Sequence, residues 1–241
     1  MRVVFLIVIF STIAFLLIDP LSLSGAVYLS VLLVVLPGLA IAQPAVSNVA
    51  MISRQQAYVT SGITILSIGS LALALGLRGD NTGNMGQYFY LEDWSQVILA
   101  SLALTCLGLT ILSVFYLLRR YLGISETEIT RHLIPVTRRD KMLFTVLAVC
   151  AGFGEEVAYR AYTISTIATA TGSPFGATVL SSVAFGMVHS YQGILGVFRT
   201  GIFGLMMGFA LLYTESIWSV MMAHVLINLL VGLVLAEKLI D

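Results

Sequence analysis

The stretch MLFTVLAVCAGFGEEVAYRAYTISTIATA, residues 142–170, decides the class of fold. It is long enough to cross a bilayer as one helix, because about 20 apolar residues span the hydrocarbon core. Three ionisable side chains nevertheless lie inside it, those of Glu155, Glu156 and Arg160. A charge near the bilayer centre costs at least about 2.5 kcal/mol, so an ionisable residue there is a candidate for function.

Long apolar runs of the same kind make up the rest of the chain. Of 241 residues, 59% are hydrophobic and 10% are charged, whereas a soluble domain carries roughly 25% charged residues. Helices are expected, since the runs lack the alternation of barrel strands and unpaired backbone is prohibitive in lipid. We therefore predict an all-α, polytopic membrane helical bundle of about eight transmembrane helices. The predicted spans are residues 3–18, 23–43, 57–77, 95–118, 142–170, 174–191, 194–213 and 216–236.

The first apolar run has two interpretations. Residues 3–18 follow a single basic residue and could form the apolar region of a cleaved signal peptide. Because the run at 23–43 follows almost at once, we favour an uncleaved first span. The alternative of a cleaved signal stays open.

The positions of the basic residues predict the orientation. Twelve Lys and Arg balance twelve Asp and Glu, so net charge gives no reason to expect a nucleic-acid partner. Basic residues gather in the segment 119–141, which we therefore place in the cytoplasm. These are Arg119, Arg120, Arg131, Arg138, Arg139 and Lys141. With eight spans both termini are then cytoplasmic, in an integral membrane protein of the plasma membrane if the cell is prokaryotic.

The predicted spans and the basic segment divide the chain into three regions. Residues 1–118 form an N-terminal region of four transmembrane helices, 119–141 a basic interfacial segment, and 142–236 a C-terminal transmembrane region. Within the middle segment, Ser125 followed by Glu128 has the spacing of a capping box. A short interfacial helix is expected to begin there.

Helix geometry separates the two glutamates of the fifth span. Glu156 and Arg160 are four residues apart and share a face, the spacing of an acid and base pair. Glu155 points about 100° away. A buried ion pair that fixes helix packing would explain Glu156 and Arg160, but it leaves Glu155 as a spare carboxylate.

Two histidines and one asparagine complete the candidate site. His189 follows Phe185 by four residues, and His224 shares a helix face with Asn228. Each histidine alone is typical of helix packing. Together with Glu155 they supply a base, polar groups that hold a water, and donors for an oxyanion.

The sequences EEVAYR (155–160), FGMVH (185–189) and HVLIN (224–228) resemble the three ordered motifs of the CPBP family of intramembrane proteases. That family includes the type II CAAX prenyl endopeptidases and bacterial bacteriocin-processing or immunity proteins. The resemblance covers about residues 140–235. The first motif departs from the usual pattern, in which Phe stands at the position of Tyr159 and Gly at that of Ala161.

The resemblance implies a role for each site residue. Glu155 resembles the catalytic carboxylate, and His189 resembles its water-positioning partner. His224 and Asn228 resemble the groups that stabilise the tetrahedral intermediate. Glu156 and Arg160 resemble supporting residues.

The sequence leaves open whether the protein uses a metal ion. Glu155, His189 and His224 are possible zinc ligands, and family members are commonly labelled metalloproteases. A His-Glu-x-x-His helix is absent from the sequence. A metal-free mechanism, in which Glu155 and His189 activate water, uses the same residues. The sequence favours neither the zinc-dependent nor the metal-free mechanism.

We therefore expect an intramembrane endopeptidase, a hydrolase acting on a membrane-associated, prenylated or leader-peptide substrate. Its expected partners are the lipid bilayer and a peptide or protein substrate, and not nucleic acid. Two alternatives remain. One is a non-catalytic membrane immunity or scaffold protein. The other is a proton-coupled transporter, which would more naturally show paired halves with broken helices.

Overall fold

The computed structural model describes residues 23–43, 49–78, 85–90 and 93–236, and no strand occurs within them. The α-helices are α2 (Leu23–Ser30), α3 (Leu36–Ala42), α4 (Arg54–Leu77), α5 (Trp94–Leu122), α6 (Glu128–His132), α7 (Arg138–Glu155), α8 (Ser165–Thr171), α9 (Pro174–Val188), α10 (Gly193–Thr214) and α11 (Ile217–Leu230). The π-helical turns are η1 (Val31–Val35), η4 (Glu156–Ile164) and η6 (Val231–Leu235). Short 3₁₀ turns are η2 (Val49–Met51), η3 (Met85–Phe89) and η5 (Ser190–Gln192).

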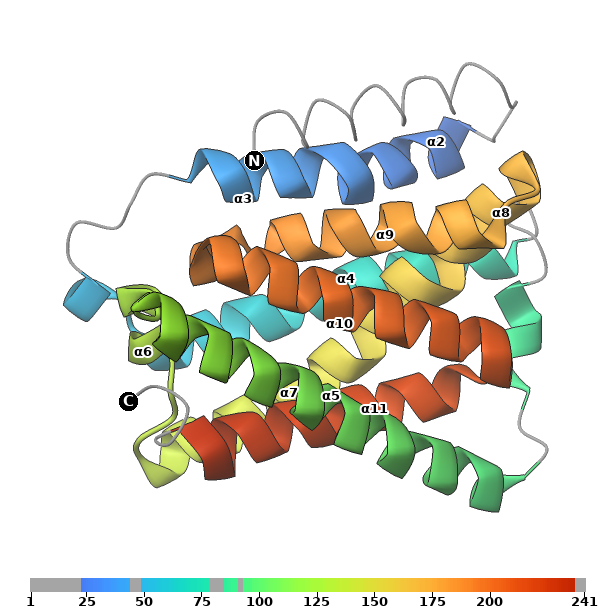
Figure 1. The fold of residues 1–241 in the computed structure, drawn as a ribbon. Helices are drawn as coiled ribbons and strands as arrows, with labels where there is room; N and C mark the ends of the chain where they lie inside the picture. The colour runs from blue at the N-terminus through green and yellow to red at the C-terminus, as the bar shows by residue number, and fades with distance from the viewer. Residues whose placement is uncertain (1–22, 44–48, 79–84, 91–92, 237–241) are drawn as a thin grey trace.

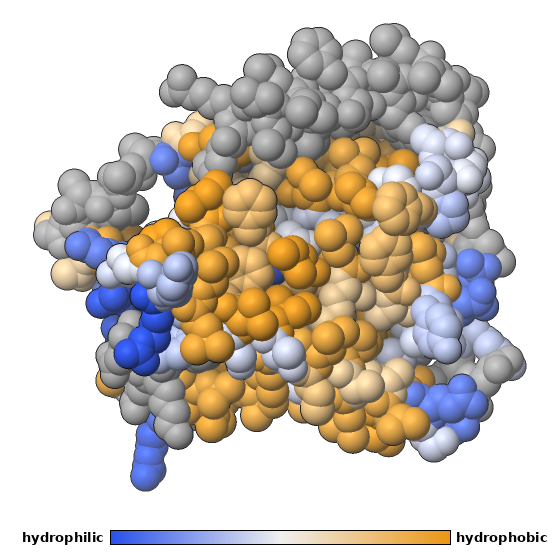
Figure 2. All heavy atoms as spheres, viewed as in Figure 1, coloured by the Kyte–Doolittle hydropathy of each residue, from blue (hydrophilic) through white to orange (hydrophobic). Residues whose placement is uncertain are grey.

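Six continuous helical stretches in the described part of the chain are long and apolar enough to cross a membrane. They are Leu23–Ala42, Arg54–Leu77, Trp94–Leu122, Arg138–Thr171, Ser190–Thr214 and Ile217–Leu235. The predicted all-α polytopic membrane bundle is thereby confirmed, and the protein is an integral membrane protein. Figure 2 shows the matching surface, a broad apolar face with hydrophilic residues gathered toward its ends.

The predicted count of eight spans is approximate. The first predicted span, 3–18, lies outside the described residues, as does the question of a cleaved signal. The predicted span 174–191 is instead a shorter apolar helix, Pro174–Val188. The helix stops early because the chain leaves α-helical geometry at His189 and turns through η5, after which Gly193 has a positive φ of 78°.

The helices lie side by side in Figure 1, with α5 running across the front of the bundle. Two pairs of helices approach each other closely through glycine. A Cβ on Gly69 of α4 would stand 2.4 Å from the Cα of Gly154 in α7. A Cβ on Gly186 of α9 would stand 3.0 Å from the Cα of Gly201 in α10. Small residues therefore bring these backbones together, as is common between membrane helices.

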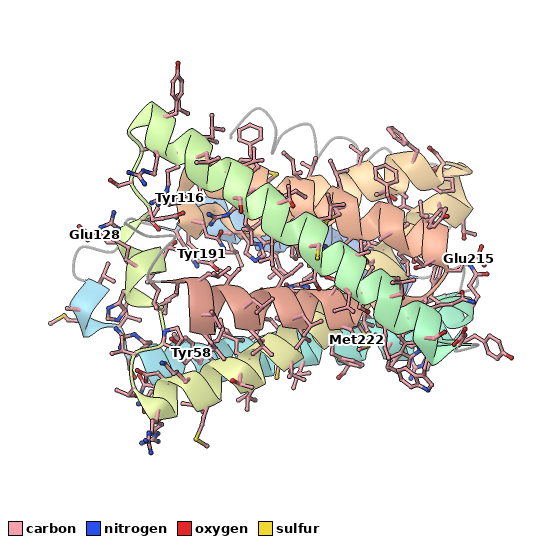
Figure 3. The ribbon with its side chains drawn as sticks, turned by 60° about the horizontal axis from the view of Figure 1, so that its bottom comes forward. Tyr58, Tyr116, Glu128, Tyr191, Glu215 and Met222 are labelled. Atoms are coloured by element: carbon pink, nitrogen blue, oxygen red, sulfur yellow. The ribbon has the colours of Figure 1, made fainter. Side chains whose placement is uncertain are left out.

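One end of the bundle gathers the loops that the sequence assigns to the cytoplasm. Arg54 pairs with Asp140 at 3.5 Å, so the start of α4 lies against the start of α7. Arg199 of α10 pairs with Glu126 at 2.9 Å. Figure 3 shows Tyr58, Tyr116, Glu128 and Tyr191 toward this end and Glu215 at the other. The compartment that this end faces stays a prediction, and so does the division into three regions.

The predicted capping box at Ser125 is wrong. The N-cap of α6 is Thr127, two residues later, whose side chain accepts a hydrogen bond from the Thr130 amide. The capping box of this segment starts α7 instead, where Thr137 and Asp140 each accept from the other's backbone N–H. Here Asp occupies the position that Glu or Gln usually fills, so the sequence pattern missed it.

Candidate active site

The site is built around a change of helix type. At Glu155 the α-helix α7 passes into the π-helix η4, in which all nine residues are buried. The Thr163 hydroxyl donates to the Ala158 carbonyl oxygen five residues earlier at 2.8 Å. Turns of π-helix inside α-helices frequently mark functional sites. The sequence did not predict this one, because its apolar pattern carries no signal for helix type.

Glu156 joins two partners at once. One carboxylate oxygen lies 3.2 Å from Nε of Arg160, so the predicted ion pair is present. The other oxygen accepts a hydrogen bond from Nδ1 of His224 at 2.6 Å. Both charged residues are at most 1% exposed, so Glu156 links η4 to α11 inside the bundle. The interpretation of Glu156 as a partner of Arg160 alone is therefore incomplete.

Glu155 is the less buried of the two carboxylates, and its side chain is 15% exposed. One of its oxygens lies 3.7 Å from Nε2 of His224. The two glutamates thus face the two nitrogens of one imidazole ring. Arg160 and His224 are thus the groups that face the two carboxylates inside the bundle, and buried carboxylates need such partners.

His189 lies at the C-terminal end of α9 with its ring orientation fixed. Its Nδ1 is 2.8 Å from the Phe185 carbonyl oxygen. Because a carbonyl only accepts, Nδ1 carries the hydrogen, and Nε2 keeps a lone pair in the neutral ring. Glu155 and His224 are both near enough to act on this imidazole electrostatically.

The Phe185 ring forms a wall shared by the charged groups. Its centroid lies 4.7 Å from the His189 ring and 6.5 Å from the His224 ring. The Arg160 guanidinium carbon lies 4.1 Å from the same centroid, the geometry of a cation–π contact. Phe203 of α10 packs on the other histidine, with ring centroids of Phe203 and His224 5.7 Å apart. Nothing in the sequence had pointed to Phe203.

Asn228 is the predicted residue that stands apart. It lies one turn beyond His224 on α11 and is half-buried. Among the described residues, its side chain makes no hydrogen bond to another member of the site. The structure thus gathers Glu155, Glu156 and His224 directly, places His189 beside them, and leaves Asn228 a turn away.

The predicted zinc ligands are not arranged as a metal set. Within the described ranges, no group of three or more His, Cys, Asp or Glu side chains is placed to hold a metal ion. Nδ1 of His224 is engaged by Glu156, and its Nε2 lies 3.7 Å from an oxygen of Glu155. The three side chains are thus not pre-arranged around a metal, and zinc binding by Glu155, His189 and His224 stays a prediction.

An apolar groove of about 590 Å³ lies elsewhere, between α5 and α10. Apart from Tyr213 and Thr214 its lining is apolar, and it contains none of the predicted site residues. Figure 2 shows apolar residues over this face of the bundle. The groove carries no group for acid or base chemistry.

The fold and the site together define a polytopic membrane protein with a buried cluster of carboxylates and histidines. Residues 138–230 match the family model described as type II CAAX prenyl endopeptidase Rce1-like. The matched segment begins where α7 begins, ends where α11 ends, and contains all three motifs. No curated protein and no solved structure matches the chain.

The family resemblance predicted from the motifs is thereby confirmed over residues 138–230, which match the model of this family. The match supports an intramembrane endopeptidase in general. It does not assign the substrate or the role of any residue.

Proposed function

We propose that this protein hydrolyses a peptide bond within the membrane, with Glu155 and His189 activating the water. The observation that carries the proposal is the second carboxylate. Glu156 contacts both Arg160 and His224, whereas Glu155 is free of a hydrogen bond among the described residues and partly exposed. Because the family match is to endopeptidases, we propose that Glu155 is the base that activates water for cleavage of a peptide bond.

The proposed first step is attack by water. The lone pair on Nε2 of His189 accepts one water hydrogen and orients the oxygen, since Nδ1 is held by Phe185. Glu155 takes the other proton while the water oxygen bonds to the peptide carbonyl carbon. The carbonyl electron pair moves to its oxygen, and a tetrahedral oxyanion results.

The proposed second step breaks the peptide bond. Glu155 returns its proton to the leaving nitrogen as the C–N bond breaks, so water is divided between an acid and an amine. His224, protonated opposite Glu156, donates from Nε2 to the oxyanion. Asn228 is proposed as the second donor, from the next turn of α11.

No step in this mechanism passes through a metal, because Glu155 and His189 supply the base and the water-binding nitrogen that the reaction needs. We expect the rate of cleavage to survive treatment with EDTA and with 1,10-phenanthroline. Purified protein is expected to contain well under one zinc ion per chain by elemental analysis. Loss of activity on chelation that is restored by zinc would contradict this part of the proposal.

The proposed substrates are peptides held at the membrane. The family description names a CAAX prenyl endopeptidase, so we propose prenylated CAAX tails as one substrate class. Leader peptides of membrane-associated precursors fit the same chemistry. We propose that the peptide enters from the end of the bundle that carries the basic segment. His189 lies at that end, where Thr127 donates to the Tyr191 carbonyl oxygen.

The test of this function is a proteomic comparison of a wild-type strain with a Glu155→Ala strain. We expect at least one uncleaved precursor to accumulate when Glu155 is lost. Glu128→Gln, which changes an exposed carboxylate on α6, is the matched control and should leave the proteome unchanged. Identical proteomes in all three strains would contradict proteolysis and favour a binding role.

A further inference from the structure

Buried polar atoms without a hydrogen-bond partner gather in one short segment. Among the described residues, and apart from the Ser216 hydroxyl, these atoms belong to Glu156, Tyr159, Arg160, Tyr162 and Ser165. All of them lie in η4 or at the residue that follows it. Glu156 and Arg160 face each other as an ion pair, whereas the hydroxyls have no such contact. An unpaired buried donor costs about 1–3 kcal/mol, so each hydroxyl is expected to meet a water or a ligand.

Tyr159 places one such donor beside the proposed reaction centre. The residue is 5% exposed, and its hydroxyl has no partner among the described residues. Its ring packs edge-on against Phe185 with centroids 5.3 Å apart, and Phe185 in turn contacts His189. The Glu155 carboxylate is near enough to act on the Tyr159 hydroxyl electrostatically.

The backbone of Tyr159 is held in place independently of its hydroxyl. The Tyr159 carbonyl oxygen accepts a hydrogen bond of 2.6 Å from the Ser181 hydroxyl on α9. The ring is therefore fixed by the backbone bond and the Phe185 contact. Nothing in the folding of the described residues requires the phenolic oxygen.

Tyr162 offers a matched comparison within the same turn. Its side chain is fully buried, and its hydroxyl also lacks a partner among the described residues. Its ring contacts Tyr28 of α2 at 5.0 Å, and not the aromatic wall formed by Phe185. The two tyrosines thus share helix, burial and chemistry, and they differ in what they face.

Building on the proposed function, we infer that the Tyr159 hydroxyl donates a hydrogen bond to a main-chain carbonyl oxygen of the bound peptide. A peptide that reaches Glu155 and His189 brings carbonyl oxygens to this wall, and a phenol is a suitable donor for them. The family motif usually has Phe here, so the contact is an addition in this chain to the general mechanism. Tyr159 is a substrate-binding residue and takes no part in proton transfer.

The experiment compares Tyr159→Phe with Tyr162→Phe in purified protein reconstituted in liposomes. The probes are two internally quenched peptides, one with a farnesylated cysteine fourth from its carboxyl terminus and one unprenylated hydrophobic leader peptide. Because one neutral hydrogen bond is lost, KM for Tyr159→Phe should rise about 3- to 10-fold while kcat changes little. Tyr162→Phe should match the wild type, and Tm should not fall in either variant.

Three results would overturn the inference. Unchanged KM in Tyr159→Phe would show that a water or nothing occupies the hydroxyl. A fall in Tm would show a structural role, and an equal rise in KM for Tyr162→Phe would show a general effect of the turn.

Failure of the proposed function gives a different result. If the wild type cleaves neither peptide, or if Glu155→Gln cleaves as fast as the wild type, the function itself is contradicted, and the inference with it. If Glu155→Gln is inactive and Tyr159→Phe equals the wild type, only the assignment of Tyr159 fails.

Discussion

The helix α5 and the π-helix η4 differ in where most of their polar side chains find partners. Along the 29 residues of α5, Ser101, Thr105, Thr110 and Ser113 each donate to the carbonyl oxygen four residues earlier in the same helix. Of these, Ser101 also donates to the Ser219 carbonyl oxygen of α11. In η4, by contrast, the carboxylate of Glu156 reaches the neighbouring helix α11, and several other polar atoms have no partner among the described residues.

The difference teaches how to separate structure from function in a membrane helix. A hydroxyl that donates to a carbonyl oxygen of its own helix has its hydrogen bond wherever the helix lies in lipid, and it needs no partner on a neighbouring helix. A buried ion pair that reaches between helices has to be balanced by a specific set of partners. The functional groups of this protein are therefore expected beside such a pair, as Glu155 is beside His224.

The largest effect on stability is expected for Glu156→Gln. The change leaves Arg160 buried without a counter-ion, and breaking a buried pair on one side costs about 3–5 kcal/mol. It also removes the negative charge that faces Nδ1 of His224, so activity should fall as well. The free energy of unfolding from SDS titration and the rate of peptide cleavage measure the two effects.

The control for this change is Glu128→Gln, at an exposed position of α6. It should stay within about 0.5 kcal/mol of the wild type, as surface changes usually do. Equal stabilities of the two variants would show that η4 tolerates loss of charge as well as the surface does. The proposed difference between η4 and α5 would then be wrong.

A smaller loss of stability is expected when a packed glycine is replaced by alanine. The comparison is between a glycine of α7, next to η4, and a glycine of α5. A Cβ on Gly154 at the end of α7 would lie 2.4 Å from the Ile65 carbonyl oxygen, which is rigid backbone. A Cβ on Gly108 of α5 would lie 2.5 Å from Cδ1 of Ile227, the movable end of a side chain. We expect Gly154→Ala to lose about 1–3 kcal/mol of unfolding free energy. Gly108→Ala should lose less in the same titration, because the helix propensity of alanine offsets part of the clash.

If the order of the two glycine variants were reversed, the α5 face would be packed more tightly than the helix that carries the site. Rates of peptide cleavage in the surviving protein complete the test. They should be close to the wild-type rate in Gly108→Ala.

The smallest effect is expected for Thr105→Val in α5. The Thr105 hydroxyl donates only to the Ser101 carbonyl oxygen at 2.7 Å among the described residues, and valine keeps the shape of the side chain. The free energy of unfolding should change by no more than about 0.5–1.5 kcal/mol, the net worth of one hydrogen bond. Cleavage should be unchanged, and a large loss of activity would show that α5 takes part in the site.

Much of the fold and part of the site could be predicted from the sequence. Apolar runs long enough to span a bilayer are local features, and they predicted the helical bundle. The spacing of Glu156 and Arg160 along one helix is also local, and the ion pair is present. The three motifs led to a family that the match over residues 138–230 confirms.

The remaining features depend on contacts between distant parts of the chain. The hydrogen bond between Glu156 and His224 joins residues 68 positions apart, so the spacing of residues along a helix does not predict it. The π-helix η4 depends on packing against α4, α9 and α11, and a sequence read at 3.6 residues per turn cannot distinguish it from an α-helix. The early end of α9 similarly depends on the turn at His189, which hydropathy does not show.

The central claim is that Glu155 is the spare carboxylate that activates water. It is tested most directly by the initial rate of cleavage of a quenched membrane peptide by wild-type protein and Glu155→Gln. We expect the rate to fall about 10²- to 10⁴-fold, the usual contribution of a general base, while Tm stays close to that of the wild type. A Glu155→Gln variant that cleaves the peptide at the wild-type rate would contradict the claim.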